Sequence, residues 1–228
     1  LAWATEKPGR YIIEDDYDCE FRLAGKPIPS LSGIDRSERV IYTNTFSQTL
    51  GSAFRIAYMV LPAHLARVYR ERMGFYSCTV PAIDQIALAR FIEQGDLDRH
   101  INRTKTRCKA VRNALIEALR LTPASPYLSF ENIDSGLHFL MEVHTQGEAS
   151  PEENRPQDNS ASCTLLENAM VESLLKQDVA ARSLSSYRIG ADEAPDSSRC
   201  RLVISYAGLS KRDARAAAEA ISRALVSF

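Results

Sequence analysis

The sequence predicts an α/β protein in which a strand-rich layer precedes a smaller α+β segment. Strand-like segments dominate the first third of the 228 residues, with little helix between them. Two helical segments follow, and a strand–helix–strand–strand–helix series closes the chain. We therefore expect a first domain over residues 1–95 and a second over 96–228, which includes a long connecting helix.

The front strands surround a loop of small and hydroxyl residues. RYIIEDD is apolar and then acidic, which predicts a buried strand with carboxylates at its C-terminal end. RVIYTNTF and FRIAYMVLP are two further strands, and the second ends at Pro62. They flank the loop TNTFSQTL, residues 43–50.

Helical patterns follow in AHLARVYRERMGF and in a run from Pro81 that Gly95 ends. Residues 97–119 form a long amphipathic helix with a basic run. A solvated helix face is the ordinary explanation of that run, and nucleic-acid contact is the alternative. The basic residues are Arg99, Arg103, Lys105, Arg107, Lys109 and Arg112.

The rear segment alternates strands and helices. YLSFENI and GLHFLMEVH predict strands. The polar residues 145–162 predict a surface excursion or a disordered insertion, and SCTLLENAMVESLLKQDV predicts a helix capped by Ser162. ARSLSSYRI and RCRLVISYAGL predict two more strands. We expect Ser210 to cap the last helix, which carries an alanine-rich apolar face.

Composition excludes several classes of protein. The chain is 45% hydrophobic and 25% charged with a net charge of −1, so neither nucleic-acid nor lipid binding is expected of it alone. No apolar run reaches the ~20 residues of a membrane span. The opening LAWATEKPGR lacks an initiator Met and a signal peptide, which suggests a cytoplasmic chain cut from a longer protein. The five scattered cysteines lack zinc or disulfide spacing and are expected to be reduced thiols that mostly pack.

Polar groups follow the first strand, and hydroxyls follow the second. Carboxylates and a phenol at a strand's C-terminal end lie where ligands bind open α/β sheets, although acidic residues there often only begin a loop. Thr45 and Ser47 suit a phosphate, for which Arg55 can supply a guanidinium. If Arg55 is buried within its strand, it needs either a bound anion or an ordinary carboxylate partner.

Three motifs of this chain carry a family resemblance: IIEDDYDCEFR, RVIYTNTFSQTLGSAFRIAYMVLP and PAIDQIALARFIEQGDLDRHINR. They resemble the aminotransferase-like domain of MocR-type regulators. These GntR-superfamily proteins carry a fold-type-I pyridoxal 5'-phosphate (PLP) module behind a winged helix-turn-helix. The resemblance covers nearly the whole chain, with poor matches at 145–162 and 190–198. It implies the back part of a fold-type-I PLP-transferase large domain plus a smaller α+β C-terminal domain.

The resemblance also implies roles for individual residues. Asp15 would lie under the pyridine nitrogen of PLP and Tyr17 would bond the ring's phenolic oxygen. The phosphate would be held by Thr45, Ser47 and Arg55. Gln48 stands where the family has its Schiff-base lysine. Because an amide nitrogen is not a usable nucleophile, Gln48 cannot form that covalent link, and transamination should be impaired.

The resemblance implies that Arg201, in SRCRLVISYAG, is the arginine that binds the substrate's α-carboxylate. Arg199 is the other candidate for this role, and Arg201 could instead be an ordinary surface arginine of its strand. His138 is expected to be structural, and no metal site is expected. Lys26 is a poor substitute for the missing lysine. The family's front portion, with its main phosphate-binding turn, is not among these residues. A homodimer is implied, and DNA would be reached only through an upstream winged-helix domain.

Three functions remain open at this point. The first is a PLP-sensing effector and dimerisation domain of a transcription regulator, which responds to PLP or an amino-acid-like compound. The second is a class I/II aminotransferase, and the third is a scaffold that has lost its cofactor. The choice of the first rests on the resemblance alone.

Overall fold

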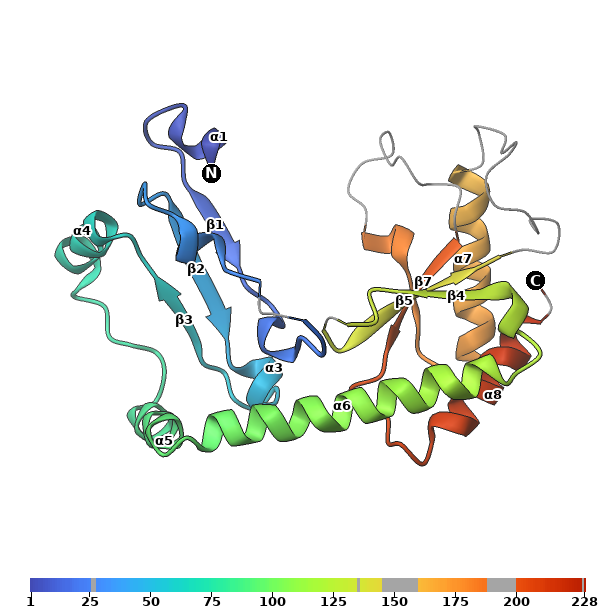
Figure 1. Cartoon of the computed structure of the whole chain (residues 1–228). Helices are drawn as coiled ribbons and strands as arrows, with labels where there is room; N and C mark the ends of the chain where they lie inside the picture. Colours follow the sequence, from blue (N-terminus) through green and yellow to red (C-terminus); the bar gives the residue numbers. More distant parts are fainter. Residues whose placement is uncertain (26–27, 135, 145–159, 188–199, 227) are drawn as a thin grey trace. The chain divides into compact units, whose positions relative to one another are not determined.

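The computed structural model describes residues 1–25, 28–134, 136–144, 160–187, 200–226 and 228 (Figure 1). The chain divides into two compact units, Leu1–Arg103 and Thr104–Phe228. The division falls within the long helix α6 (Asp96–Arg120), some residues beyond the boundary expected from the sequence. Among the described residues, no helix combines the length and hydrophobicity that a membrane span requires.

The first unit contains a three-stranded sheet in the order β1-β2-β3 (Figure 1). Strands β1 (Ile12–Asp15) and β2 (Val40–Thr45) are parallel, whereas β3 (Ala57–Val60) is antiparallel to β2. The carboxyl ends of β1 and β2 therefore meet the amino end of β3 at one edge, which we call the carboxyl edge.

The register decides which side chains share a face. Asp15 is paired with Thr43, and Thr45 with Ala57. Because side chains two residues apart along a strand point the same way, Asp15 and Thr45 project from one face near the carboxyl edge. Ile13 lies on this face too and is 71% exposed. The expectation that β1 is buried was therefore wrong for this face, since no described element covers it.

Five helices accompany this sheet: α1 (Ala2–Thr5), α2 (Leu31–Ile34), α3 (Ser47–Leu50), α4 (Ala63–Met73) and α5 (Ala82–Glu93). The sequence predicted α4 and α5 but not the three single-turn helices. The helix α2 is held by the carboxylate of Glu14, which accepts hydrogen bonds from the amides of Leu31 and Ser32 at 2.7 and 2.9 Å. Ser30 also caps α2, because its hydroxyl accepts from the Gly33 amide at 3.0 Å, but a serine in this Gly-, Pro- and Ser-rich stretch is equally typical of a loop.

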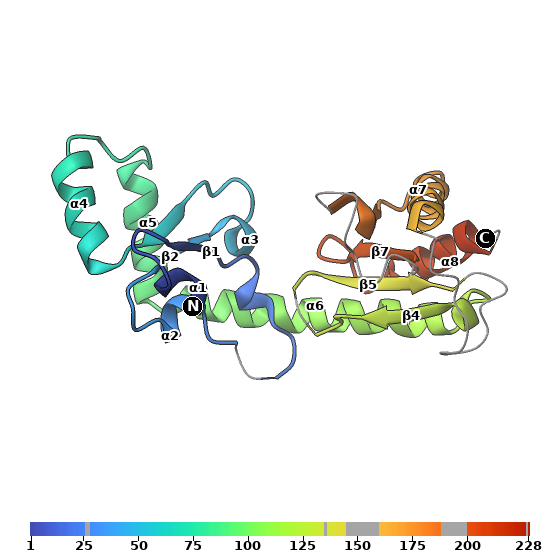
Figure 2. The ribbon, with the colours of Figure 1, turned by 90° about the horizontal axis from the view of Figure 1, so that it is seen from above.

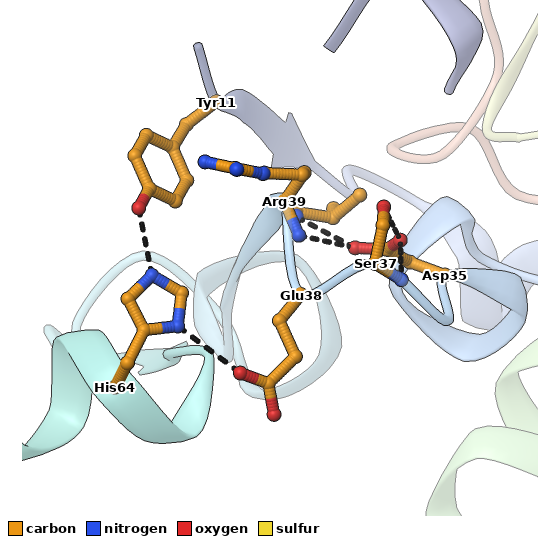
Figure 3. A network of polar contacts seen from close by, with 7 residues as sticks. Tyr11, Asp35, Ser37, Glu38, Arg39 and His64 are labelled. Atoms are coloured by element: carbon orange, nitrogen blue, oxygen red, sulfur yellow. Dashed lines mark hydrogen bonds and ion pairs between the residues drawn. The ribbon is translucent and has the colours of Figure 1, made fainter. Parts of the chain in front are cut away.

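A polar network lies beside the amino ends of β1 and β2 (Figure 3). The Tyr11 hydroxyl and the His64 Nε2 are 2.7 Å apart, and the His64 Nδ1 is 3.1 Å from a carboxylate oxygen of Glu38. The guanidinium of Arg39 lies 5.4 Å from the centre of the Tyr11 ring. His64 is in the first turn of α4, so the network fastens that helix to the residues that precede β1 and β2.

Asp35 organises the turn that leads into β2 (Figure 3). Its carboxylate accepts hydrogen bonds from the Ser37 amide and hydroxyl at 2.8 and 2.6 Å, and from two further amides at 2.6 and 2.9 Å. These bonds, that of the Ser37 hydroxyl first, lower the pKa of Asp35 from 3.8 to about 2. The two further amides are those of Arg39 and Val40.

We expect Asp35→Asn to lower the free energy of unfolding at pH 7 by about 1 kcal/mol, a value kept small because solvent screens this partly exposed group. Since the folded state lowers the pKa of Asp35, its contribution is full above 3.8 and is lost as the pH falls toward 2. Urea unfolding of both proteins from pH 7 to 2 checks this. A difference that persists unchanged at pH 2 would show that the carboxylate charge is not responsible.

The second unit contains an antiparallel sheet in the order β4-β5-β7-β6. Figure 2 labels the first three of these strands. The strands are β4 (Leu128–Glu131), β5 (His138–Val143), β6 (Arg182–Ser183) and β7 (Cys200–Ser205). Helix α7 (Ser160–Leu175) packs against β6, β7 and α8 (Ala214–Leu225). The core is made of fully buried side chains that include Leu119, Phe139, Met141, Met170, Leu174, Leu202 and Ile221.

Several local predictions for the second unit were wrong. The last helix begins at Ala214 after Asp213, whose carboxylate accepts a hydrogen bond from Ser210 at 2.6 Å, so Ser210 is not the cap. The described part of ARSLSSYRI, residues 181–187, forms the two-residue β6 and then a 3-10 turn, Leu184–Tyr187, instead of one long strand. Helix α7 begins before Ser162, whose side chain lies outside the described residues.

The basic run on α6 is mostly exposed, with Arg112 as the exception. Arg112 is 5% exposed, and its guanidinium donates to the Ile133 carbonyl, to Asp134 at 3.1 Å and to Asn113. A buried guanidinium with several acceptors ties α6 to the turn before β5. The prediction of a uniformly solvated face failed here because these partners lie outside the helical pattern.

Candidate functional site

Two hydroxyls and a guanidinium gather at the carboxyl edge. The hydroxyl oxygens of Thr45 and Ser47 are 3.1 Å apart, and the Ser47 amide donates to the Thr45 hydroxyl at 3.2 Å. A guanidinium nitrogen of Arg55 lies 3.5 Å from the Ser47 hydroxyl. The carbonyls of Phe54 and Ile56 accept from these hydroxyls, so the segment before β3 fixes their positions.

Arg55 differs from its expected setting. It precedes β3 rather than lying inside the strand, and its side chain is exposed. The argument that a buried arginine needs an anion therefore fails. Its position still leaves a positive charge beside two hydroxyls, which is a chemical environment that suits a phosphate or carboxylate.

The acidic motif after β1 divides between two faces of the sheet. The Asp16 carboxylate accepts a hydrogen bond from the Tyr42 hydroxyl at 2.7 Å. Burial, with this bond, raises the pKa of Tyr42 well above its usual value, so the phenol stays a donor. Asp15 points from the opposite face and is exposed, and Tyr17 is 56% exposed. Alternation along the strand places these two adjacent carboxylates on opposite faces, but which of them shares a face with Thr45 depends on the register of β1 with β2.

Gln48 lies in the single-turn helix α3, between Ser47 and the buried Thr49. The ring Nε2 of His100 is 2.8 Å from the Thr49 carbonyl oxygen, which anchors α3 to the start of α6. Gly51, with φ at +96°, then redirects the chain toward Arg55. The sequence did not indicate His100, since its partner lies 51 residues away. TNTFSQTL is thus partly helical, where we expected a loop.

Arg201 lies on β7 in the second unit. Its backbone amide donates to Glu167 at 2.8 Å, and its guanidinium lies 3.7 Å from a carboxylate oxygen of Glu131. Its side chain is 14% exposed. An arginine with this partner could exchange Glu131 for the carboxylate of a ligand. Its competitor Arg199 lies outside the described residues, as does Lys26.

The residues of the carboxyl edge fit part of PLP. Arg55 supplies a charged donor for a phosphate, and Asp15 and Tyr17 supply a carboxylate and a phenol two residues apart. To donate to the phosphate as well, the Thr45 and Ser47 hydroxyls would turn their single protons away from the Ile56 and Phe54 carbonyls. Gln48 does not fit the covalent link, because an amide is not a nucleophile toward an aldehyde. These residues therefore suit PLP that is held without a covalent bond to the protein.

Hydroxyl, guanidinium and carboxylate groups at the carboxyl ends of strands are the arrangement with which open α/β sheets bind ligands. Residues 18–221 match the family model "Aminotransferase class I and II". The chain belongs to this family, which is a PLP-dependent one.

Solved structures agree on the fold. α-Aminoadipate aminotransferase LysN of Thermus thermophilus superposes with a TM-score of 0.67 at 20% identity, over 95% of this chain and 50% of that one. Kynurenine aminotransferase of Pyrococcus horikoshii gives 0.70 at 20% identity, over 95% and 48%. Both identities are low, so they establish the architecture only.

Curated relatives include helix-turn-helix regulators. The uncharacterised HTH-type transcriptional regulator YdeL of Bacillus subtilis is 40% identical over 144 residues, 63% of this chain and 31% of that protein. The probable rhizopine catabolism regulatory protein MocR of Rhizobium meliloti is 34% identical over 135 residues, 59% and 27% respectively. The chain thus spans about a third of these relatives, and the resemblance to MocR-type regulators is confirmed.

Proposed function

We propose that this chain is the aminotransferase-like effector and dimerisation part of a MocR-type transcription regulator in the cytoplasm. It binds PLP, or a PLP-related amino compound, and biases a DNA-binding domain elsewhere in the protein. The observation that carries the proposal is the grouping of Thr45, Ser47 and Arg55 beside Gln48. This arrangement keeps the anion-binding groups and lacks the catalytic amine.

In this proposal, each side chain contacts a different part of the ligand. Thr45 and Ser47 turn their hydroxyl protons from the Ile56 and Phe54 carbonyls to the phosphate, and Arg55 supplies the compensating charge. Asp15 pairs with the pyridine nitrogen, and Tyr17 with the ring's phenolic oxygen. When bound to an enzyme, PLP acts as an electron sink for bonds at an amino acid's α-carbon. Gln48 neither attaches the cofactor nor moves a proton, so the chain senses its ligand and does not convert it to a product.

Arg201 would supply the second anion contact, for the carboxylate of an amino-acid-like effector. It would exchange Glu131, at 3.7 Å, for that ligand. The proposal includes a homodimer, because proteins of the resembled family build such sites between two subunits. DNA contact belongs to a winged-helix domain and not to this chain.

The alternative, a class I/II aminotransferase, is favoured by the fold, which solved aminotransferases share. Gln48 opposes it, because no amine in this position can accept or return the α-proton. Single-turnover mixing with PLP and an amino-acid donor separates the two: measurable keto-acid formation would support the enzyme.

Arg55→Ala is expected to weaken PLP binding about 10–100-fold, since a charge-assisted phosphate contact contributes about 1.5–3 kcal/mol. Isothermal titration of the whole protein with PLP measures this. The matched control is Arg70→Ala, which removes an exposed arginine from α4 and should leave the affinity unchanged. Equal affinities for the Arg55 variant and the native protein would remove the basis of the phosphate assignment.

A further inference from the structure

Two cysteine sulfurs in the second unit lie unusually close together. The Sγ atoms of Cys163 and Cys200 are 3.1 Å apart. Non-bonded carbons in contact are ~3.5–4.0 Å apart, and sulfur is larger than carbon. A disulfide bond measures about 2.05 Å, so a shift of about 1 Å would join these atoms.

The surrounding elements hold the two sulfurs in place. Cys163 is in α7 and Cys200 is the first residue of β7. One helical turn after Cys163, the carboxylate of Glu167 accepts hydrogen bonds from the amides of Arg201 at 2.8 Å and Ser185 at 3.0 Å. Residues four apart on a helix share a face, so one face of α7 meets the first two residues of β7. The contact is therefore set by packing and by buried hydrogen bonds.

We propose that Cys163 and Cys200 form a reversible disulfide, which makes this contact a redox-sensitive modification site. The oxidant is a low-molecular-weight disulfide of the glutathione class. The Cys163 thiolate attacks one of its sulfurs and releases one thiolate, which leaves a mixed disulfide on Cys163. Cys200 then loses its proton to solvent and attacks the Cys163 sulfur, releasing the second thiolate. Two protein thiols are oxidised and one small disulfide is reduced to two thiols.

The order of these steps follows from exposure. Cys163 is half-buried and can be reached from solvent, whereas Cys200 is 5% exposed. An incoming disulfide therefore meets Cys163 first, and the buried Cys200 acts as the resolving thiol. This assignment departs from the sequence-based expectation that the cysteines mostly pack as separate reduced thiols.

The other cysteines serve as internal references. Cys19 and Cys78 are exposed, and both lie in the first unit. Although the residue is exposed, partial burial of the Cys19 thiol and the neighbouring Asp16 raise its pKa to about 12, which keeps the thiol protonated and slow to exchange. Cys78 is the reference for an exposed thiol that has no described cysteine partner in contact.

The test is to equilibrate the reduced protein with glutathione redox buffers and digest it without reducing agent. We expect one cross-linked peptide pair containing Cys163 and Cys200, a loss of two thiols per chain, and full reversal by dithiothreitol. Cys78→Ser should keep the cross-link, and Cys163→Ser should abolish it. In Cys200→Ala, Cys163 should instead retain a bound glutathione, which shows that it reacts first.

A second measurement does not depend on any variant. Oxidation should slow hydrogen exchange at the Arg201 amide at least ~10-fold, because the cross-link opposes separation of α7 from β7. The proposal is overturned if Cys78 becomes glutathionylated while Cys163 and Cys200 both remain free thiols. It is equally overturned if the cross-linked peptides contain any other pair of cysteines.

Discussion

Gln48→Lys is expected to convert the proposed non-covalent PLP site into a covalent one. The lysine Nζ would bond to the cofactor's aldehyde carbon, and the protein would acquire the absorption band of lysine-linked PLP. Borohydride should fix the label to the peptide that contains position 48. Retention through dialysis should increase by at least about 100-fold, equivalent to about 2.8 kcal/mol. The native protein should show neither the band nor the label.

The physical reason lies in the position of Gln48 and in the chemistry of its side chain. Position 48 directly follows Ser47, whose hydroxyl is 3.5 Å from the Arg55 guanidinium, so it lies next to the proposed phosphate contacts. The amide nitrogen of glutamine is delocalised into its carbonyl, whereas a lysine amine can attack an aldehyde. The substitution adds a nucleophile and leaves the proposed anion-binding groups intact.

Gln48→Arg is the matched control for this experiment. It adds a positive charge of similar reach but no nucleophilic amine. Tighter PLP binding by Gln48→Arg without the absorption band would separate charge from covalent chemistry. If native protein and Gln48→Lys gave bands of equal strength, the role assigned to position 48 would be wrong.

The sequence predicted the elements that carry strong local patterns. The front strands, α4, α5 and the long α6 followed from apolar periodicity, with Gly95 ending α5 as expected. The single-turn α2 was missed because the Glu14 carboxylate that holds it comes from another part of the chain. Burial was also misjudged where it depends on neighbours, as the exposed Ile13 and buried Arg112 show.

The candidate site was predictable in composition but not in arrangement. The sequence indicated Asp15, Thr45, Ser47 and Arg55, and the parallel pairing of β1 with β2 explains why the first two share an edge and a face. The assignment of Asp15 rather than Asp16 to the face of Thr45 depends on strand register, and the His100 anchor depends on a helix that begins far along the chain. Whether Arg201 serves the same ligand stays a prediction.

Glu167→Ala is expected to lower the free energy of unfolding of the second unit by about 3 kcal/mol. Glu167 is 2% exposed and accepts from the Arg201 and Ser185 amides, so its removal leaves two donors without an acceptor. Hydrogen bonds to charged groups contribute about 1.5–3 kcal/mol, and water entering the space can satisfy part of the loss. Urea unfolding followed by circular dichroism measures the change.

Two variants separate the role of the carboxylate from that of helix α7 as a whole. Glu172→Ala removes an exposed carboxylate from the same helix and should change stability by less than about 0.5 kcal/mol. Glu167→Gln keeps the side-chain size but offers one acceptor oxygen in place of two, so its loss should be intermediate. Because Glu167 sets the contact between α7 and β7, Glu167→Ala should also slow formation of the Cys163–Cys200 disulfide. If Glu167→Ala were as stable as Glu172→Ala, this carboxylate could not be what fastens α7 to the strand that carries Arg201.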